Sequence, residues 1–298
     1  MPAEKAKTYH EVGATVPGGL RHKLGRFGLG WRVLAYVPVT AWAVLSLFPL
    51  YWMLVAAFSP PSVVMSTPPR LVPNPATLGN FLRIFRLASI LRWLGNSLLV
   101  ATVVSCSNMF LGAMAGYVLA KKRFPGAKIA FWLTILTMMI PGQLGVVPMY
   151  LLTAKLGWLD SLKPLIIPDM VVAFSIFLMK QYLTSLPTEI IESAKLDGAS
   201  ELRIFLQLVI PMAKPGLAVL GIYTFVGYYN ALFWPLLVLS SREKFTIQPG
   251  LSTLRFQFTT DYGLWNAGAV FAMVPVFAVF FAFQRYFLRG ITIGALKG

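Results

Sequence analysis

Cysteine and histidine are nearly missing from this chain of 298 residues. Cys106 is the only cysteine, and the two histidines, His10 and His22, both lie near the N-terminus. One cysteine excludes an intrachain disulfide framework, and two histidines so close to one end offer no ligand set to the rest of the chain. We therefore predict no disulfide and no metal site built on cysteine or histidine.

Charged residues are also scarce. They make up 12% of the chain, about half the share in soluble domains, and only 10 are acidic against 26 Lys and Arg. The net charge of +16 could indicate a nucleic-acid partner, but no basic cluster outside the apolar runs is interleaved with stacking aromatics. An excess of Lys and Arg in the cytoplasmic loops of a membrane protein is the simpler explanation, and we expect no nucleic-acid partner.

A phosphate-binding loop is absent as well. The pattern Gly-x-x-x-x-Gly-Lys-Ser/Thr does not occur, and the chain contains no Gly-Lys dipeptide at all. Because that loop holds ATP phosphates through its backbone amides and its lysine, the chain has no ATP site of this kind. We predict that it is not an enzyme by itself, and that it has no catalytic residue, no metal and no cofactor of its own.

Hydrophobic sequence is what the chain has in abundance. Hydrophobic residues make up 57% of it, and the mean hydropathy is +0.70. They come in runs of about twenty, the length that crosses a bilayer as a helix. The pattern predicts an all-α membrane protein with six transmembrane helices, at residues 33–58, 96–120, 129–152, 164–183, 213–239 and 267–288. Residues 1–32 form a basic tail, which leaves residues 33–298 as the transmembrane domain.

The distribution of Lys and Arg predicts the orientation of these spans. With the N-terminus inside, 17 of the 26 basic residues fall on inner segments and 9 on outer segments. Basic residues collect on the cytoplasmic side of membrane proteins, so both termini are predicted to be cytoplasmic. The first outer segment carries Arg70, Arg83, Arg86 and Arg92 without an acidic counterweight. These arginines would contact lipid headgroups or, alternatively, an anionic substrate or a soluble partner.

One polar segment, residues 186–211, interrupts the apolar sequence between the fourth and fifth spans. It holds four of the ten acidic residues of the chain, which are Glu189, Glu192, Asp197 and Glu201. Pro187 ends the preceding span, Asp197-Gly198 is a turn signature, and Ser200 can cap the helix that follows. The segment is therefore predicted to form two short helices joined by a tight turn.

The second of these two helices is predicted to have an apolar face. Its apolar residues recur at three- and four-residue spacing, namely Leu202, Phe205, Leu206 and Val209. An amphipathic loop lying on the bilayer is one interpretation, but such loops carry a basic polar face. This segment has more acidic than basic residues, and an anionic leaflet would repel it. We therefore favour a protein partner that receives the segment.

The segment resembles the cytoplasmic loop of permease subunits in binding-protein-dependent ABC importers. The motif of that family is Glu-Ala-Ala, three residues, Gly, nine residues, Ile, one residue and Leu-Pro. The chain matches it in register with Glu192-Ser193-Ala194, Gly198, Leu208, Ile210 and Pro211. Ser193, Leu208 and Ile210 depart from the motif, each by a small change in size.

The resemblance extends over about residues 33–298 and is greatest to the maltose-type sugar permeases. Asn96-Ser97, Phe124-Pro125-Gly126, Tyr229-Asn230 and the terminal Lys297-Gly298 carry it outside the loop. It implies a type I ABC importer permease fold, in which the loop at residues 184–212 contacts an ATPase subunit. The coupling residues that it implies are Glu189, Glu192, Ala194, Asp197, Gly198, Ala199 and Pro211.

Polar groups within the apolar spans are the candidates for a substrate pathway, namely Gln143, Asp169, Tyr229 and Asn230. Gln143 lies beside Pro141-Gly142, where a helix kink is predicted. Asp169 lies inside the fourth span, where a charge is a functional candidate by default. Alternatively, Asp169 is solvated near the outer interface, and the other three residues tie helices together.

The residues and the resemblance together predict a permease subunit of an ATP-driven importer, in the cytoplasmic membrane of a bacterium or archaeon. The resemblance implies as partners a second homologous permease, two ATPase subunits that hold ATP and magnesium, and an extracytoplasmic solute-binding protein. The expected substrate is a carbohydrate, in particular an oligosaccharide. An anionic solute is the alternative, such as a uronic-acid oligosaccharide of the alginate type or glycerol-3-phosphate. An autonomous secondary transporter would need coupling charges or an inverted repeat, and the sequence shows neither.

Overall fold

The computed structural model describes residues 29–87, 89–257 and 261–295, which form helices joined by loops. They divide into two units, with the boundary after Trp52. The basic tail predicted at residues 1–32 lies outside the described residues up to residue 28.

The first unit is formed by most of helix α2 (Leu29–Ala57), which matches the predicted first span. Its segment Tyr36–Ala57 is long and apolar enough to cross a bilayer. Pro38 and Pro49 lie within the helix and do not end it. Large apolar side chains along α2, such as Trp42, are exposed, as expected of a helix that faces lipid or a partner.

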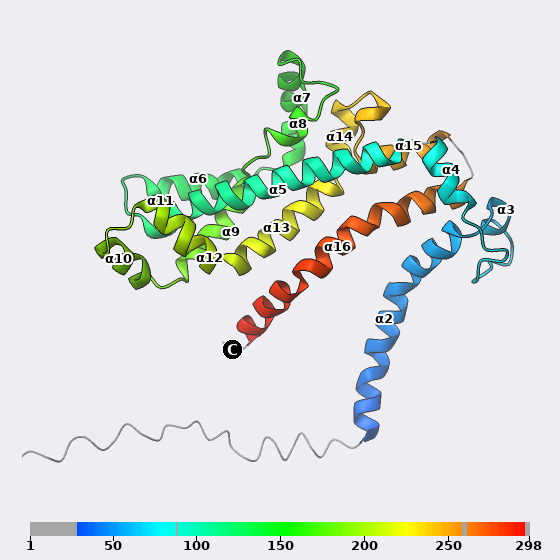
Figure 1. The fold of residues 1–298 in the computed structure, drawn as a ribbon, viewed down its shortest axis with the longest axis horizontal. Coiled ribbons are helices and arrows are strands. Elements are labelled where there is room, and N and C mark those ends of the chain that lie inside the picture. Colours follow the sequence, from blue (N-terminus) through cyan, green and yellow to red (C-terminus); the bar gives the residue numbers. More distant parts are fainter. Residues whose placement is uncertain (1–28, 88, 258–260, 296–298) are drawn as a thin grey trace, which may run out of the picture. The chain divides into compact units, whose positions relative to one another are not determined.

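The second unit contains the remaining helices, whose bounds follow in chain order. They are α3 (Pro61–Val64), α4 (Gly79–Leu87), α5 (Ile90–Lys121), α6 (Ala127–Met139), the 3-10 turn η1 (Gly142–Gly145), α7 (Val146–Lys155), α8 (Lys163–Ile166), α9 (Ala173–Thr184), α10 (Glu189–Leu196), α11 (Glu201–Ile204), the π-helical turn η2 (Phe205–Val209), α12 (Ile210–Met212), α13 (Lys214–Tyr229), α14 (Phe233–Val238), the 3-10 turn η3 (Arg242–Lys244), α15 (Ile247–Gln257) and α16 (Tyr262–Ala295). Helix α5 packs against α9 and α13, and α13 packs against α16 (Figure 1).

Three described helices are long and apolar enough to cross a membrane, and they lie at Tyr36–Ala57, Ile90–Lys121 and Tyr262–Gln284. Two bent helix pairs raise this number to five if each pair is one span. The prediction of a multi-span, all-helical protein is therefore confirmed for the described residues. The number of six spans and the side of the membrane on which the termini lie stay predictions.

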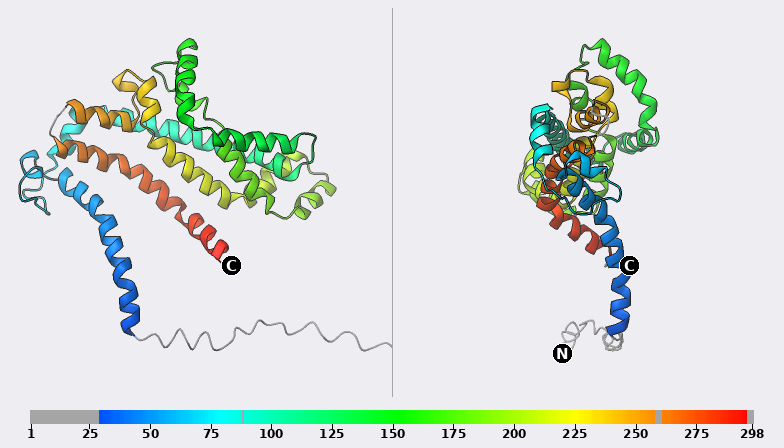
Figure 2. Two further views of the ribbon diagram at one scale, coloured as in Figure 1. Left: turned by 180° about the vertical axis from the view of Figure 1, so that it is seen from behind. Right: turned by 90° about the vertical axis from the view of Figure 1, so that its right-hand side faces the viewer.

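The predicted third span is bent far more sharply than a proline kink. Helices α6 and α7 meet at 88° across the Pro141–Gly145 turn, and α7 stands away from the direction of α6 in each view (Figures 1 and 2). Pro141 cannot donate a backbone hydrogen bond and disfavours helix at the residue before it. The position of the bend was predicted, whereas its size was not.

The prediction of a continuous helix at residues 164–183 is wrong. The chain forms the single turn α8, leaves helical structure from Ile167 to Val172, and resumes it in α9. Pro168 contributes to this break because it lacks an amide proton. The predicted fifth span is also interrupted, since α13 ends at Tyr229 and α14 begins at Phe233.

Two apolar clusters lie toward opposite ends of the second unit (Figure 1). The loop end is the end at which α10 and α11 pack on α5, α9 and α13, through buried residues such as Tyr117, Leu183 and Phe205. The far end is the end at which α4, the start of α5, α15 and the start of α16 meet, around Trp93 and Leu254. Helix α15 was not predicted.

Candidate functional site

The polar segment forms the two helices that its sequence predicts. Glu189 and Glu192 occupy the first turn of α10, where the helix dipole favours negative charge. After α10 ends, Gly198 takes a φ of +76°, a left-handed conformation that glycine adopts without steric cost. Ser200 then caps α11, because its Oγ accepts a hydrogen bond from the amide of Arg203 at 3.4 Å.

The predicted coupling residues lie together on the surface of the loop end. Those that are exposed are Glu189, Glu192, Asp197, Gly198 and Pro211, whereas Ala194 and Ala199 are half-buried. A Cβ atom placed on Gly198 would have no atom of the described chain within 4 Å. The surface beside the turn is therefore open in this chain, and the contact with an ATPase subunit stays a prediction.

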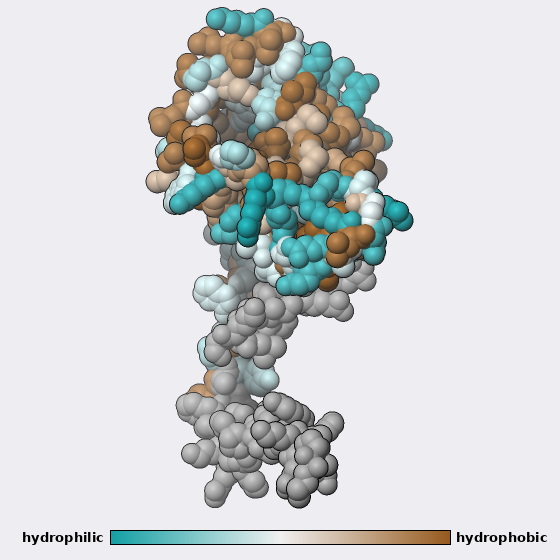
Figure 3. Space-filling model, turned by 90° about the vertical axis from the view of Figure 1, so that its left-hand side faces the viewer, coloured by the Kyte–Doolittle hydropathy of each residue, from teal (hydrophilic) through white to brown (hydrophobic). Residues whose placement is uncertain are grey.

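The exposed surface of α10 combines charge with one prominent apolar side chain. Leu196, beside Asp197, is 89% exposed, and Ile190 is exposed as well. Figure 3 views the loop end and shows hydrophilic residues gathered across it, with hydrophobic residues around them. Single exposed apolar residues are normal on protein surfaces and do not mark a contact site by themselves.

Two kinds of interaction fix α10 to the rest of the loop end. Ile191 is buried and packs into the apolar cluster of this end. Glu201, at the start of α11, pairs with Lys122 and, at 3.4 Å, with Lys195, and it accepts a hydrogen bond from the Tyr117 hydroxyl at 3.3 Å. We call these four polar residues the Glu201 cluster. It joins the C-terminal end of α5 to both helices of the loop.

The Glu201 cluster gives that residue a role the sequence did not reveal. The hydrogen bond from Lys122 to the Glu201 carboxylate, together with the charges of Lys122 and Lys195, lowers the pKa of Glu201. Glu201 is therefore ionised and occupied within the chain. The acidic groups left for a partner are those of Glu189, Glu192 and Asp197.

The apolar face predicted for the second helix is half wrong. Phe205 and Val209 are buried as predicted, but Leu202 is 64% exposed and Leu206 is 45% exposed. Ile204 is fully buried in their place. The π-helical turn η2 begins at Phe205, and its wider winding shifts which residues share a face.

Asp169 lies in the break between α8 and α9, and Asn108 of α5 holds this break in place. Asn108 is fully buried, and its amide nitrogen donates to the carbonyls of Val104 at 2.9 Å and Asp169 at 2.7 Å. Its Oδ1 accepts from the Val172 amide at 3.0 Å and from the Ser175 hydroxyl at 2.6 Å. An asparagine within an apolar run was the one sequence signal for this site.

The remaining pathway candidates lie apart from one another. Gln143 is exposed on η1, at the bend between α6 and α7. Tyr229 is buried, and its hydroxyl donates to the carbonyl of Ala272 at 2.7 Å, which ties α13 to α16. Asn230 is exposed at the end of α13 and accepts a hydrogen bond from Gln248 of α15 at 3.0 Å. The four candidates therefore do not form one site.

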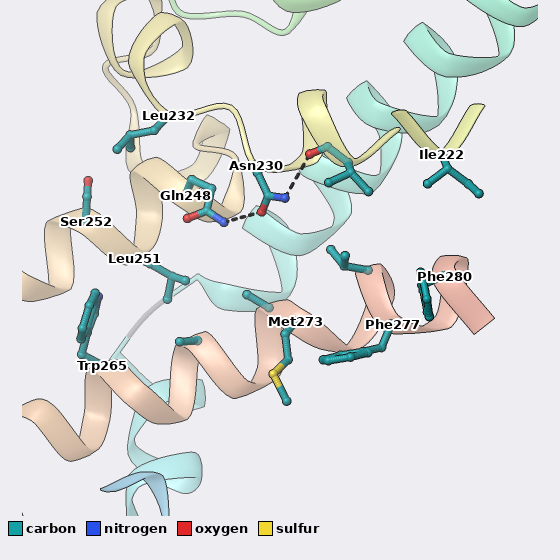
Figure 4. Close-up of a pocket in the computed structure, with 14 residues that line it drawn as sticks. Ile222, Asn230, Leu232, Gln248, Leu251, Ser252, Trp265, Met273, Phe277 and Phe280 are labelled. Atoms are coloured by element: carbon teal, nitrogen blue, oxygen red, sulfur yellow. Dashed lines mark hydrogen bonds between the residues drawn. The ribbon is translucent and has the colours of Figure 1, made fainter. Parts of the chain in front are cut away.

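A cavity of about 800 Å³ lies among α13, α15 and α16 (Figure 4). Asn230 lines it, and the other three pathway candidates do not. Gln248, Ser252 and Trp265 line the same cavity, and the sequence did not single them out. Most of the remaining lining is apolar, with Phe277 and Phe280 on α16. Its volume is in the range of pockets that hold small molecules.

Two of the arginines predicted to lack acidic partners have them. Arg83 pairs with Asp261 at 2.6 Å, and Arg92 pairs with Glu243 at 3.1 Å. Both acidic residues come from segments far along the chain, so no local pattern could reveal the pairs. Arg70 donates to the carbonyl of Asn74 at 3.0 Å.

Comparisons with known proteins complete the description. Residues 108–293, well over half of the chain, match the family model "Binding-protein-dependent transport system inner membrane component". The chain belongs to this family. It is a multi-pass membrane permease of a binding-protein-dependent ABC transport system, and ATP hydrolysis belongs to a separate subunit.

Individual relatives agree with this assignment. The permease is 33% identical to the arabinooligosaccharides transport system permease protein AraQ of Halalkalibacterium halodurans, over 88% of this chain and 98% of the relative. It is 31% identical to the sn-glycerol-3-phosphate transport system permease protein UgpE of Yersinia enterocolitica, over 88% and 96%. Its fold matches a chain of a bacterial ABC transporter involved in the import of the acidic polysaccharide alginate, with a TM-score of 0.78, 23% identity, and coverage of 86% of this chain and 96% of that one.

Proposed function

We propose that this permease is one of two transmembrane subunits of an ATP-driven oligosaccharide importer. The observation that carries the proposal is the exposed helix α10, which presents the family motif beside a glycine of positive φ. The proposed complex contains a second homologous permease, two ATPase subunits that bind ATP and magnesium, and a solute-binding protein. We further propose that it lies in the cytoplasmic membrane of a bacterium or archaeon, with six spans and both termini inside, an arrangement in which α10 would face the cytoplasm.

The loop end provides a route from the ATPase to the spans. Closure of the two ATPase subunits would displace α10, which is short and packed through Ile191. The apolar cluster of the loop end and the Glu201 cluster connect α10 to α5 and α13. Displacement of α10 would therefore move α13, which lines the cavity, and so open the substrate path to alternate sides.

An oligosaccharide is the proposed substrate class because a relative of high coverage is named for arabinooligosaccharides. The names of two other similar proteins, for glycerol-3-phosphate and for alginate, favour an anionic solute as a second candidate. The exposed Arg86 is consistent with such a solute at the surface. The cavity is lined by uncharged residues, and this bears on the choice between an oligosaccharide and an anionic solute.

The loop contact is tested in the transporter reconstituted with its ATPase subunits and its binding protein. Gly198→Trp and Glu192→Lys should abolish uptake and release the ATPase, while membrane insertion remains normal. Gly198→Ala introduces strain at the positive φ of this position without the bulk of a tryptophan side chain. Ser193→Ala is a matched control because it restores the residue usual in the motif. Normal uptake in both the tryptophan and lysine variants would remove α10 from the mechanism. A purified permease that transports without ATP would contradict the importer itself.

A further inference from the structure

We propose that the cavity among α13, α15 and α16 is a binding site for a neutral saccharide unit, with Asn230 and Gln248 as its polar contacts and Trp265 as an apolar platform. The proposal rests on the proposed function as an oligosaccharide permease and adds the site and its preference for uncharged sugars. Figure 4 shows these residues around the cavity.

The two amides are joined to each other but retain hydrogen-bonding capacity. Asn230 donates to the Val226 carbonyl at 3.0 Å, and Gln248 donates to the Asn230 Oδ1 at 3.0 Å. Each amide has two N–H groups and one carbonyl oxygen. Among the described residues, the second N–H of each and the Gln248 Oε1 have no hydrogen-bond partner. Sugar hydroxyls, which both donate and accept, match this mixed set.

The rest of the cavity suits the carbon face of a sugar ring. Trp265, Met273 and Phe277 approach it from α16, and the amides lie on α13 and α15 (Figure 4). Sugar rings carry hydroxyls at their edges and apolar C–H groups on their faces, so they bind where aromatic surface lies beside polar groups. A lipid acyl chain would fill the apolar part but would leave the amides unsatisfied, which is unfavourable.

The charge of the lining discriminates between the two substrate classes. All fourteen described residues that line the cavity are uncharged. A carboxylate or phosphate in such a cavity would lose its hydration without gaining a cation, and sites for these groups use Arg or Lys. Arg83 and Arg92, two arginines that could otherwise supply such a cation, are paired with acidic residues. The site therefore fits a neutral saccharide and disfavours a uronic acid or a phosphate.

Cysteine protection tests occupancy directly. In a Cys106→Ala background, Ser252→Cys places a thiol in the cavity of the reconstituted transporter, and Thr253→Cys places one beside it on α15, where Thr253 does not line the cavity. Millimolar neutral arabino-oligosaccharides and malto-oligosaccharides should slow the reaction of the Ser252→Cys thiol with a small methanethiosulfonate, and should leave that of Thr253→Cys unchanged. Alginate oligosaccharides and glycerol-3-phosphate should protect neither thiol.

Two results would overturn the proposal. One is a Ser252→Cys thiol that no neutral saccharide protects, whether it reacts freely or stays unreactive because lipid or the partner permease fills the cavity. The other is stronger protection by the anionic probes than by the neutral ones. Either result would leave the importer itself intact, since the α10 variants and ATP-driven uptake by the unmodified transporter test that function separately.

Uptake kinetics test the role of the amide. With the saccharide that protects best as substrate, Gln248→Leu should raise KM about tenfold or more, because a hydroxyl loses its partner. Thr253→Val, on the same helix, is the matched control, because among the described residues its hydroxyl bonds only to the Gly250 carbonyl; its KM should be unchanged. Gln248→Arg should shift the preference of the cavity toward the anionic probes. Equal KM values in Gln248→Leu and Thr253→Val would contradict the assignment of Gln248.

Discussion

Both ends of the helix bundle carry ion pairs, which at the far end are Arg83–Asp261 and Arg92–Glu243, but the far end also has neutral hydrogen bonds between elements. At the far end, neutral side chains of α5 bond to the backbone of the segment before α15. The Trp93 ring nitrogen donates to the Arg242 carbonyl at 2.6 Å, Asn96 donates to the Phe245 carbonyl at 3.0 Å, and the Ile247 amide donates to the Ser97 hydroxyl at 2.7 Å. At the loop end, ion pairs of the Glu201 cluster join α5 to α10 and α11.

The neutral hydrogen bonds of the far end and the ion pairs of the loop end differ in how much energy a displacement costs. Buried neutral hydrogen bonds depend on close geometry, and breaking one leaves an unsatisfied group in an apolar surrounding. Ion pairs between exposed side chains contribute little stability and tolerate changes in distance, because water screens them. Glu201 and Lys195 are exposed, whereas the side chain of Lys122 is only 23% exposed. We therefore expect the loop end to shift at a lower energetic cost than the far end, which its proposed contact with an ATPase would require.

The largest effect is expected from a substitution that breaks the packing of the far end. A Cβ atom on Gly250 would lie 2.2 Å from Trp93 Cε3, so Gly250→Ala forces the ring away from its bond with Arg242. We expect a loss of at least about 2 kcal/mol of stability, from overpacking together with the broken bond. Thermal unfolding of the purified transporter measures it.

Gly227→Ala on α13 is the matched control, because no atom of the described residues beyond its own helix lies within 4 Å of the added carbon. That variant should unfold at the wild-type temperature or slightly above it, since alanine favours helix. Equal melting temperatures for Gly250→Ala and the wild type would show that the far end is not rigid.

The next largest effect is expected between the two ends, at Asn108. Asn108→Leu keeps the size of the side chain but leaves the Asp169 carbonyl, the Val172 amide and the Ser175 hydroxyl without their partner. We expect a loss of about 2–3 kcal/mol, because buried polar groups are left unsatisfied. Ser107→Ala is the control, since the Ser107 side chain bonds, within the described part of the chain, only to the carbonyl of Val104 in its own helix. A melting temperature as high as that of this control would mean that the break before α9 is held by other contacts.

The same contrast explains which parts of the fold the sequence could predict. The two helices of the polar loop and the turn between them were predicted because their signals are local, whereas the apolar face of the second helix was predicted only in part. Pro187 and Ser200 act on their own neighbours, and Gly198 is needed where the backbone turns to a positive φ. Helix α5 was predicted too, because an unbroken apolar run of this length has few alternatives in a membrane.

The errors lie where distant residues decide the structure. Hydropathy could not separate a continuous helix at residues 164–183 from α8 and α9, because Asn108 satisfies the backbone groups that the break exposes. The partners of Arg83 and Arg92 lie far along the chain. The cavity combines Asn230 with Gln248 and Trp265, which come from three different helices or their ends. Polar residues in an apolar run indicate such sites but not their partners.

A smaller effect on stability, with a larger one on function, is expected at the Glu201 cluster. Glu201→Gln should change the free energy of unfolding by less than about 1 kcal/mol, because Glu201 is exposed and screened by water and the glutamine amide oxygen can still accept from the half-buried Lys122. It should nevertheless reduce uptake per ATP hydrolysed, because α10 is then held to α5 without its charge pairs, through apolar contacts and the hydrogen bonds of Lys121 to Leu186 and Thr188. Coupling in the wild type should also weaken as salt rises, and coupling in the variant should respond less to salt.

The exchange Lys122→Glu with Glu201→Lys restores opposite charges at the same positions and should recover part of the coupling. A Glu201→Gln transporter that imports as much solute per ATP as the wild type would show that the cluster is only structural. A large fall in its melting temperature would instead contradict the view that this end is held loosely.

The smallest effect concerns Asp160, a carboxylate bonded mainly to neutral groups. Its oxygens accept hydrogen bonds from the Ser240 and Ser241 amides at 3.0 and 2.8 Å, the Ser241 hydroxyl at 2.6 Å and Lys244 at 3.0 Å. The hydrogen bonds from Ser241 are the main reason that the pKa of Asp160 lies well below its usual range.

Because the pKa of Asp160 is depressed in the folded protein, its stabilisation is fully present above the unfolded pKa of about 4 and is lost as pH falls below it. The melting temperature of Asp160→Asn should therefore lie below that of the wild type by the same amount at pH 7.5 and 5.5, and by less at pH 3.5. A difference that widens on acidification would mean that Asp160 binds its proton more readily in the folded protein than in the unfolded one, which contradicts the hydrogen-bonding described for this turn.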